Sequence, residues 1–349
     1  MAEFALTLQP QTLAQISLPL GASWLLASCM EARGKQDLWI RQKPEALRML
    51  REQAIVQSVE SSNRIEGVTV PAPRLRPVVI GRVRPRDRSE EELAGYRNAL
   101  SWIFARKRLL RPTPDVIRRL HALAQSGAGD AGESKKRDNE IIEVLPGGER
   151  KLRFLPTPAR QTPDAIAQLC RNFSEACDDE KVPDILLAAT FVFDFLCIHP
   201  FRDGNGRVAR LLTTLLLLSH GFEVPRYISL ERLVEESRDD YYRVLAECSR
   251  GWHEGKNEIL PWWNYFLGLV RRAYKEFETQ VESAARPAKT ALIRRTVLDQ
   301  VEDFTLASLA AQLPNASPQL IKKVLAQLKA AGKVRLTGRG RGARWQIVP

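Results

Sequence analysis

The sequence predicts a mainly α-helical protein that ends in a small, separate module. Two segments near the middle of the chain, 184–198 and 208–219, are apolar on nearly every face, which is typical of helices buried on most sides. Between residues 292 and 328, apolar residues recur at helical spacing in three short segments. Two short alternating segments, 334–336 and 345–348, follow them and predict a pair of strands.

The length and composition indicate a globular chain with about two domains. It has 349 residues, of which 44% are hydrophobic and 7% aromatic, so ordinary cores can form and disorder or a collagen-like fold is excluded. We expect an N-terminal helical region at 1–110, a central helical region at 111–280 and a C-terminal module at 290–349. A linker is expected at 281–289, where Ser283, Arg286 and Pro287 interrupt the apolar pattern.

Cysteine usage and hydropathy predict a cytoplasmic protein without a membrane partner. The five cysteines are an odd number and include no C-x-x-C pair, which favours a reducing compartment. The apolar run within residues 1–28 lacks a basic segment before it and is broken by Pro10 and Pro19, so we expect no secretory signal. No apolar stretch is long enough for a transmembrane helix.

Basic charge is concentrated at the C-terminal end. The chain has a net charge of +12, and residues 281–349 carry 12 Lys and Arg against 4 Asp and Glu. No acidic residue follows Asp303. Residues 1–280 therefore carry 41 Lys and Arg against 37 Asp and Glu, so their positive and negative charges nearly cancel. A nucleic-acid partner is expected only for the C-terminal module.

The pattern of this module is that of a winged helix-turn-helix. Ser317 and Pro318 predict the N-cap and first residue of the third helix, and Gly332 predicts its end. The third helix could enter a DNA major groove while Arg339, Arg341 and Arg344 on the wing contact phosphates. Alternatively, 290–349 is a dimerisation or protein-docking module whose charges face solvent.

The loop between the two apolar helices carries the chemistry. The glycines at 204 and 206 let backbone amides turn inward at the start of a helix, where the dipole is positive, so we expect an anion site. Arg207 and Arg210 lie three residues apart on the first turn of that helix. Because guanidinium groups match phosphate oxygens, we expect both to reach around one phosphate group.

Two further side chains of the loop suit phosphate chemistry. Asp203 offers a hard oxygen ligand for a Mg²⁺ ion that bridges phosphates. His199 can take up a proton near neutral pH. A Walker-type loop is absent from the sequence, and the four histidines show no spacing typical of metal ligands.

The twelve residues from His199 to Arg210, HPFRDGNGRVAR, resemble the HPFx(D/E)GN(G/K)RxxR signature of the Fic family without a mismatch. Members of that family mostly transfer AMP from ATP to protein hydroxyls. The resemblance implies a Fic helical core over 111–280 and a protein adenylyltransferase that releases pyrophosphate. It further implies that the substrate is ATP, that Mg²⁺ is required, and that the target is a Ser, Thr or Tyr hydroxyl of a protein, the chain itself included.

The resemblance also assigns roles to individual residues of this chain. His199 would be the general base, and Asp203 would hold Mg²⁺. The remaining assigned residues would bind ATP: Gly204, Asn205 and Gly206 as the anion hole, Arg207 and Arg210 on the phosphates, and Tyr242 beside the adenine.

Two segments N-terminal to the signature resemble other parts of the family. Ser62-Asn-Arg-Ile-Glu-Gly67 resembles the (S/T)xxxE(G/N) inhibitory motif, which implies an inhibitory helix at about 55–67. Glu66 would pair with Arg210, with Ser62 as part of the motif, and ATP would then bind unproductively. Residues 141–156 resemble the β-hairpin flap, with Leu145, Pro146 and Gly147 at its turn, on which a target segment could add as a strand.

Several alternatives remain open from the sequence. The chain could be a DNA-binding regulator whose Fic core is secondary, or a Fic enzyme that removes AMP or transfers another phosphate-containing group. The target protein, the modified hydroxyl and the signal that relieves inhibition are not encoded in any motif. The oligomeric state is equally open, a homodimer included.

Overall fold

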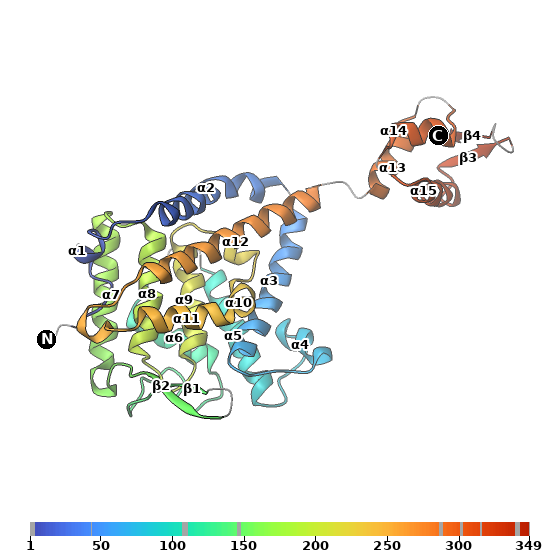
Figure 1. The fold of residues 1–349 in the computed structure, drawn as a ribbon. Coiled ribbons are helices and arrows are strands. Elements are labelled where there is room, and N and C mark those ends of the chain that lie inside the picture. Colours follow the sequence, from blue (N-terminus) through green and yellow to red (C-terminus); the bar gives the residue numbers. More distant parts are fainter. Residues whose placement is uncertain are drawn as a thin grey trace. The chain divides into compact units, whose positions relative to one another are not determined.

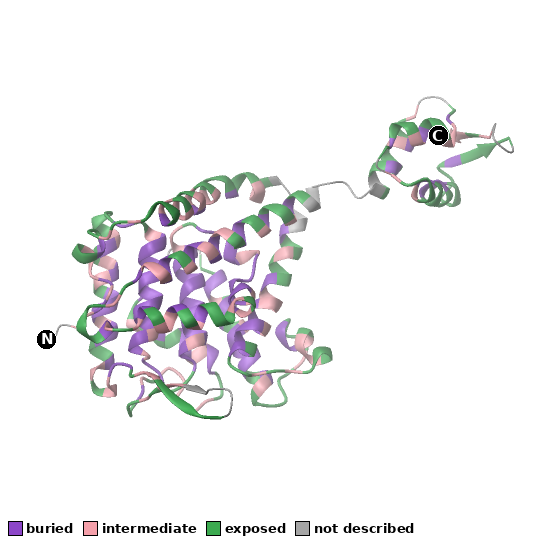
Figure 2. Ribbon diagram, viewed as in Figure 1, coloured by how far each residue is buried: buried purple, intermediate pink, exposed green. Residues whose placement is uncertain are grey.

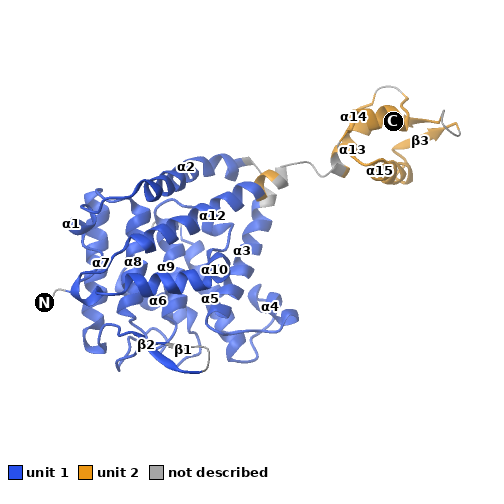
Figure 3. Ribbon diagram, in the orientation of Figure 1, with its two compact units in different colours: residues 1–279 blue, residues 280–349 orange. Residues whose placement is uncertain are grey.

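The computed structural model describes residues 4–42, 44–106, 111–144, 148–285, 289–300, 303–314, 316–338 and 343–348. The chain divides into two compact units, residues 1–279 and 280–349 (Figure 3). The prediction of a mainly α fold is confirmed, because the strands of the described residues form only two small antiparallel hairpins.

Unit 1 consists of helices with one β-hairpin at its edge, at the bottom of Figure 1. Its first six helices are α1 (Pro10–Leu13), α2 (Leu20–Gln42), α3 (Pro44–Ile65), α4 (Ala72–Val79), α5 (Arg88–Phe104) and α6 (Pro114–Ala124). After the hairpin follow α7 (Thr162–Asp179), α8 (Asp184–Ile198), α9 (Asn205–Ser219), α10 (Leu230–Glu236), α11 (Arg238–Cys248) and α12 (Leu260–Ala285). Single 3-10 turns lie at Ala159–Gln161, Val224–Arg226 and Trp252–Glu254.

Helices α8 and α9 form the centre of unit 1, and both are buried along most of their length (Figure 2). Helix α8 packs against α7 on one side and α9 on the other, and α9 in turn contacts α5 and α6. This burial follows from the sequence, since α8 carries apolar side chains on nearly every face. The loop that joins α8 to α9 is therefore held between two rigid elements.

The N-terminal segment is anchored to α8 by a buried carboxylate. Asp194 is fully buried, and its oxygens accept hydrogen bonds from the amides of Thr7 (3.1 Å) and Leu8 (2.7 Å) and from Trp252 Nε1 (2.7 Å). Burial raises the pKa of Asp194 to about 6, although these donors favour the charged form. One side chain thus fixes two segments that are remote in the sequence.

The hairpin consists of β1 (Ile141–Val144) and β2 (Arg150–Phe154), paired antiparallel with a register shift between Ile141 and Ile142. The turn residues predicted from the flap resemblance, Leu145, Pro146 and Gly147, lie outside the described residues. Phe154 stacks on His253 with a centroid distance of 5.4 Å, and His253 Nε2 lies 2.7 Å from the Leu155 carbonyl oxygen. The base of the hairpin is thereby fixed to the 3-10 turn before α12.

Unit 2 contains three helices followed by a hairpin, in the order that the sequence predicts. The elements are α13 (Lys289–Leu298), α14 (Leu306–Gln312), α15 (Pro318–Ala330), β3 (Val334–Thr337) and β4 (Arg344–Ile347). Ser317 caps α15 by accepting a hydrogen bond from the Leu320 amide, as predicted. Phe304 adds to the hairpin through two backbone hydrogen bonds with Trp345, of 3.0 and 2.7 Å.

Two expectations about boundaries need correction. Helix α12 continues through Ala285, so the first five residues of the expected linker are helical. The helix expected at about 55–67 begins earlier, at Pro44, and ends at Ile65, so that Glu66 follows its last turn. None of the helices in the described part of the chain is long and apolar enough to cross a membrane.

Candidate active site

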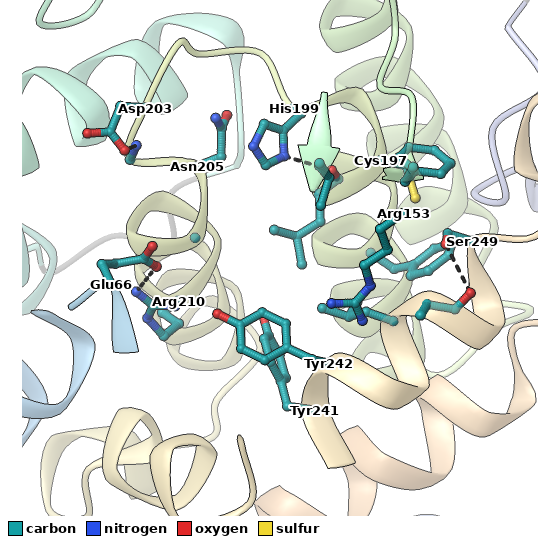
Figure 4. Close-up of a pocket in the computed structure, with 18 of the residues that line it drawn as sticks. Glu66, Arg153, Cys197, His199, Asp203, Asn205, Arg210, Tyr241, Tyr242 and Ser249 are labelled. Carbon is teal, nitrogen blue, oxygen red and sulfur yellow. Dashed lines mark hydrogen bonds and ion pairs between the residues drawn. The ribbon is translucent and has the colours of Figure 1, made fainter. Parts of the chain in front are cut away.

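The largest concentration of predicted site residues lines one pocket of unit 1. The pocket lies between the α8–α9 loop, the β-hairpin, α11 and the segment after α3. Its volume, including the open mouth, is about 860 Å³. Figure 4 shows His199 on one side of this space, Glu66 with Arg210 on another and Tyr242 below. The predicted residues that line it are Glu66, His199, Asp203, Gly204, Asn205, Gly206, Arg210 and Tyr242.

His199 is held in an uncommon backbone conformation that turns its ring into the pocket. It is the C-cap of α8, with φ 52° and ψ 62°, and together with Glu180 it is one of two non-glycine residues with positive φ among those described. Proline follows it, which disfavours a further helical turn. The left-handed conformation ends the helix and points the imidazole away from it.

The tautomer of His199 follows from its hydrogen bond. Nδ1 lies 3.1 Å from the carbonyl oxygen of Leu196 and must donate to it, because a carbonyl only accepts. Nε2 therefore carries the lone pair. Burial, with a smaller contribution from the charge of Lys135, lowers the pKa of His199 to about 4, so the ring is neutral at physiological pH. A neutral imidazole with a free Nε2 lone pair is able to accept a proton.

Asn205 fixes the shape of the loop through its side chain. Its Oδ1 accepts from the Phe201 amide at 2.9 Å, and its Nδ2 donates to the Phe201 carbonyl at 2.8 Å. The side chain is buried, so Asn205 can contribute only its backbone amide to a ligand. The amide belongs to the first turn of α9, where N–H groups lack intrahelical partners.

A second histidine supports the loop from below. His121 of α6 stacks on Phe201 with a centroid distance of 3.8 Å and an interplanar angle of 1°. Its Nδ1 accepts from the Gly132 amide at 2.8 Å, so Nε2 donates to the Asp203 carbonyl oxygen at 3.1 Å. Burial lowers the pKa of His121, which keeps this donor–acceptor pattern in the neutral ring.

The segment after α6 binds the carbonyl groups at the end of α8. Lys135 Nζ donates to the Ile198 carbonyl at 3.3 Å and to Asn139 Oδ1 at 2.8 Å. Asn139 Nδ2 in turn donates to the Phe201 carbonyl at 3.2 Å. Burial lowers the pKa of Lys135 to about 8. The loop is therefore fixed on both sides before any ligand binds.

The start of α9, where the sequence predicts an anion site, lies at the pocket. Gly204 is the N-cap with φ 78°, a conformation that favours glycine, and its amide donates to Asp203 Oδ1 at 2.6 Å. A Cβ on Gly206 would lie 2.3 Å from Glu66 Oε1 and 3.2 Å from Arg210 Nη1. Glycine at 206 therefore allows charged groups to approach the backbone of this helix closely. The side chain of Asp203 is 62% exposed, and its second oxygen, Oδ2, lies 3.5 Å from Arg207 Nη2.

Arg210 is buried, and its guanidinium is hydrogen-bonded to residues around the end of α3. Its Nε donates to Ser62 Oγ at 2.8 Å, and its Nη2 donates to the Ser62 carbonyl at 2.9 Å and to Glu66 Oε1 at 2.7 Å. The guanidinium is 5% exposed, whereas the carboxylate of Glu66 is 27% exposed. The structure thus contains the pair of Glu66 and Arg210 that the resemblance implies, and it shows in addition that Ser62 binds the same guanidinium.

Arg207 does not join Arg210 around one anion, contrary to the expectation. Its Nη1 lies 2.6 Å from Glu92 Oε2 of α5, and its Nη2 is 3.5 Å from Asp203 Oδ2. Gln125, with its amide oriented to satisfy both neighbours, accepts from Arg207 Nη2 at 2.8 Å and from the Gly204 amide at 3.2 Å. Residues three apart on a helix are neighbours on one face, but these two long side chains extend to different partners, Arg207 to α5 and Gln125 and Arg210 to the end of α3.

Two arginine side chains lie near the ring of Tyr242, and Arg153 is the one that lines the pocket. Arg153 of β2 lies with its guanidinium carbon 5.4 Å from the Tyr242 ring centroid, and Arg238 lies at 5.7 Å. Burial raises the pKa of Tyr242. Figure 4 shows Arg153 extending from the hairpin toward this ring. The Tyr242 ring is thus positioned to stack on a flat ligand group, and the guanidinium groups of Arg153 and Arg238 lie beside it.

Several supporting residues have no signal in the sequence motifs. They are Glu92, His121, Gln125, Lys135, Asn139 and Arg153, and all but Arg153 act on the α8–α9 loop or on Arg207. For Arg153, the alternation of Lys151 and Arg153 along a short strand could have indicated a basic face. The others are distant in sequence from the residues that they hold.

Comparison with known proteins finds similarity to Fic proteins over part of the chain. Residues 111–217 match the model of the Fic/DOC family. A Fido domain-containing protein of Dictyostelium discoideum is 32% identical over 100 residues, which are 28% of this chain and 66% of that protein. The protein adenylyltransferase Fic of Drosophila mojavensis is 26% identical over 220 residues, 61% of this chain and 40% of its own length. The protein of that name from Nematostella vectensis is 26% identical over 208 residues, 57% of this chain and 44% of its length.

The chain thus spans between 40 and 66% of the length of these curated relatives. Among solved structures, a Fic family protein from Desulfovibrio desulfuricans is similar with a TM-score of 0.62 at 19% identity, covering 95% of this chain and 97% of that one. A Fic domain-containing signaling protein from Bacteroides thetaiotaomicron has a TM-score of 0.62 at 22% identity over 73% of this chain and 97% of its own. At these identities the likeness establishes the fold.

Proposed function

We propose that this chain, which carries a Fic/DOC domain at residues 111–217, is a protein adenylyltransferase that transfers AMP from ATP to a hydroxyl of a target protein. The observation that carries the proposal is the convergence on one pocket of three features: a neutral His199 with its Nε2 lone pair, the amides at the start of α9, and Arg210. A base, an anion site and a cation within one space suit an attack on a phosphate.

The base in this scheme is His199. Its Nε2 accepts the proton of a Ser, Thr or Tyr hydroxyl while the hydroxyl oxygen forms a bond to the α-phosphorus of ATP. The bond from that phosphorus to the bridging oxygen breaks, and pyrophosphate leaves with the electron pair. Because Nδ1 donates to the Leu196 carbonyl, the developing imidazolium keeps a fixed orientation.

The phosphates would be held by backbone and by Arg210. The amides of Asn205 and Gly206 begin α9 and offer N–H groups and the positive end of the helix dipole. Such preorganised donors act on charge as it develops, which is where most catalysis of phosphate chemistry arises. Arg207 supports the site indirectly, since its guanidinium faces Glu92 and Gln125.

Asp203 fits a magnesium ion that is bound mainly through ATP. It is a single, largely exposed carboxylate at the edge of the pocket, and Mg²⁺ is commonly held by one or two carboxylates with substrate phosphates and water. The ion would neutralise phosphate charge when bound. Among the described residues that line the pocket, Glu66 has the only other carboxylate that could bind the Mg²⁺ ion.

We further propose that the enzyme is autoinhibited by Glu66. The Glu66 carboxylate accepts a hydrogen bond from Arg210 Nη2, so the guanidinium is not available to the γ-phosphate of ATP. The negative charge of Glu66 would also lie where the γ-phosphate would bind. Ser62 takes up two more N–H groups of Arg210. Displacement of the segment after α3 would free Arg210, and ATP could then adopt the productive pose.

The β-hairpin is suited to hold the target. Its second strand is exposed at Arg150–Leu152, and an extended peptide can add to an exposed strand through backbone hydrogen bonds. Because backbone hydrogen bonds do not depend on side chains, such binding would fix the position of the target hydroxyl without selecting a particular target sequence. Segments of the chain itself are therefore among the expected substrates.

Intact-mass spectrometry tests the reaction. Glu66→Gly protein incubated with ATP and Mg²⁺, alone and with cell lysate, is expected to produce AMP adducts that are absent with Glu66→Gly/His199→Ala. An adduct of phosphate alone would indicate a different transferred group. Loss of AMP from a previously modified protein, with no transfer, would indicate an AMP-removing enzyme.

A second function is favoured by unit 2. The exposed face of α15 carries Lys322, Lys323 and Lys329 and no acidic residue, and Arg335 and Arg344 lie on the hairpin beside it. Such a face suits the phosphates of a DNA major groove. Fluorescence anisotropy of duplex DNA with the full chain should show affinity that falls with salt and that Lys322→Ala/Lys323→Ala reduces at least about tenfold. Unchanged affinity in that variant would favour a protein-docking role.

A further inference from the structure

A cysteine, an aspartate and a histidine meet at the end of unit 1 opposite to the His199 loop. Cys177 lies in the last turn of α7, Asp184 begins α8, and His220 is the C-cap of α9. One ligand atom from each residue lies within 4.8 Å of the others. Since α8 and α9 each span 15 residues, this cluster is about 22 Å from the catalytic loop.

The spacing fits a tetrahedral metal better than it fits a hydrogen bond. His220 Nδ1 and Asp184 Oδ1 are 3.4 Å apart, which is longer than the roughly 2.7–3.2 Å of an ordinary N–H···O bond. Two ligands with bonds of about 2.1 Å to a tetrahedral zinc ion are separated by about 3.4 Å. The pair therefore already has the distance of a tetrahedral edge.

The surroundings of the cluster orient its ligands without occupying them. Arg33 Nη1 donates to the His220 carbonyl at 3.1 Å and lies over Phe222 at 5.2 Å, which positions the histidine. Arg111, the other nearby cation, is bound by Asp178 through two hydrogen bonds of 2.8 and 3.2 Å.

The cluster is also accessible. The side chain of Asp184 is 42% exposed and that of His220 is 17% exposed, so an ion can enter and a water molecule can fill a fourth position. Cys177 is half-buried, which suits a ligand that closes the inner side of the site. Among the residues that the structure describes, no other group of three such side chains comes together in this way.

We propose that Cys177, Asp184 and His220 bind one Zn²⁺ ion, with solvent in the fourth position. Thiolate and carboxylate together balance the charge of the ion, and sulfur, nitrogen and oxygen ligands are those that zinc takes in proteins. The ion would join one end each of α7, α8 and α9, and α8 and α9 flank the His199 loop at their other ends.

Binding must displace the thiol proton. Burial, and then the negative charge of Asp184, raise the pKa of Cys177 to about 11, while Arg111 opposes this shift and Asp178 adds to it. Zinc uptake therefore releases a proton, and its affinity rises with pH.

Cobalt(II) serves as the spectroscopic probe. Full-length, metal-stripped protein titrated with Co²⁺ should develop the visible bands of a tetrahedral ion and a near-ultraviolet thiolate-to-cobalt band, saturating at one ion per chain, and Zn²⁺ should displace them. Cys177→Ser should abolish the thiolate band. Asp184→Asn and His220→Gln should weaken affinity at least about tenfold.

Matched variants separate this site from other ligands of the chain. Cys170→Ser on the same helix and His253→Gln at an exposed position should bind Co²⁺ as wild type does, and His199→Ala should also bind normally, whatever its effect on AMP transfer. Circular dichroism verifies that each variant is folded. Spectra without a thiolate band in the wild type, or an equal band in Cys177→Ser, would overturn the proposal.

Discussion

Arg210 and Glu66 lie 144 positions apart in the chain, and the structure places Nη2 of the arginine 2.7 Å from Oε1 of the glutamate. The contact is made at the pocket that also contains His199. Arg210 is nearly inaccessible and forms three hydrogen bonds to the end of α3. A cation that is placed at a phosphate site but held by its own chain is the physical basis of the proposed inhibition.

Ser62→Ala should relieve inhibition in part. The substitution removes the acceptor of Arg210 Nε but leaves the backbone carbonyl of residue 62 and Glu66 in place. Loss of one hydrogen bond to a charged group is worth about 1.5–3 kcal/mol, and only part of this favours release. Self-modification with labelled ATP should therefore rise, but less than in Glu66→Gly. A rise equal to that of Glu66→Gly would show that the serine, and not the carboxylate, holds Arg210.

Glu92→Ala should destabilise unit 1 strongly. It leaves the buried guanidinium of Arg207 without its nearer and buried carboxylate partner, and breaking a buried pair typically costs about 3–5 kcal/mol of unfolding free energy. Glu91→Ala, an exposed neighbour on the same helix, is the matched control and should cost less than about 1 kcal/mol. Urea denaturation measures both. If the two variants were equally stable, the pairing of Glu92 with Arg207 would not hold the loop.

The pKa of His199 predicts how stability and activity respond to acid. The pKa is about 4 in the folded chain and near 6.5 when unfolded, so the unfolded state takes up the proton first as pH falls. The contribution of His199 to stability is complete above about pH 6.5 and decreases down to about pH 4. Wild type should lose more stability than His199→Gln between pH 7 and 4.5, as measured by denaturation in urea.

The low pKa of His199 also predicts where the rate of AMP transfer begins to fall as the pH is lowered. For the free enzyme, kcat/KM of Glu66→Gly should stay level from pH 8 to about 5.5 as far as His199 is concerned, because the base remains neutral. A limb near pH 6.5 would contradict a desolvated His199.

Asp194→Ala should release the N-terminal segment. Three buried donors lose their acceptor, the amides of Thr7 and Leu8 and Trp252 Nε1, and the expected loss is about 2–5 kcal/mol of unfolding free energy. Hydrogen exchange at the Leu8 amide should accelerate. Asp164→Ala, at the exposed start of α7, should change stability by less than about 1 kcal/mol. Slow exchange at Leu8 in Asp194→Ala would mean that other contacts hold the segment.

Parts of the fold and site follow from local sequence. The helix from Asp184 to Ile198 is predicted residue by residue, because an apolar pattern and a following proline are local signals. The cap at Ser317 is equally local. The meeting of Glu66 with Arg210 is not local, and it was predictable only because both lie in motifs that resemble those of a known family.

Other features depend on contacts between distant elements. Arg207 and Glu92 are 115 positions apart, and nothing in either segment indicates the other. The stacking of His121 on Phe201 and the meeting of Cys177 with His220 depend in the same way on how helices pack. Side-chain spacing along one helix predicts which residues share a face, but the partner on that face is set by tertiary structure.

The initial rate of AMP incorporation, measured with ATP labelled at the α-phosphate in wild type and in Glu66→Gly, tests the central claim most directly. Freeing a guanidinium from a charged hydrogen bond worth about 1.5–3 kcal/mol predicts a rate about 10- to 150-fold higher in Glu66→Gly. Glu60→Gln, a nearby glutamate on α3, is the control and should match wild type. Equal rates in wild type and Glu66→Gly, or incorporation of label only in a parallel reaction with ATP labelled at the γ-phosphate, would contradict an adenylyltransferase restrained by Glu66.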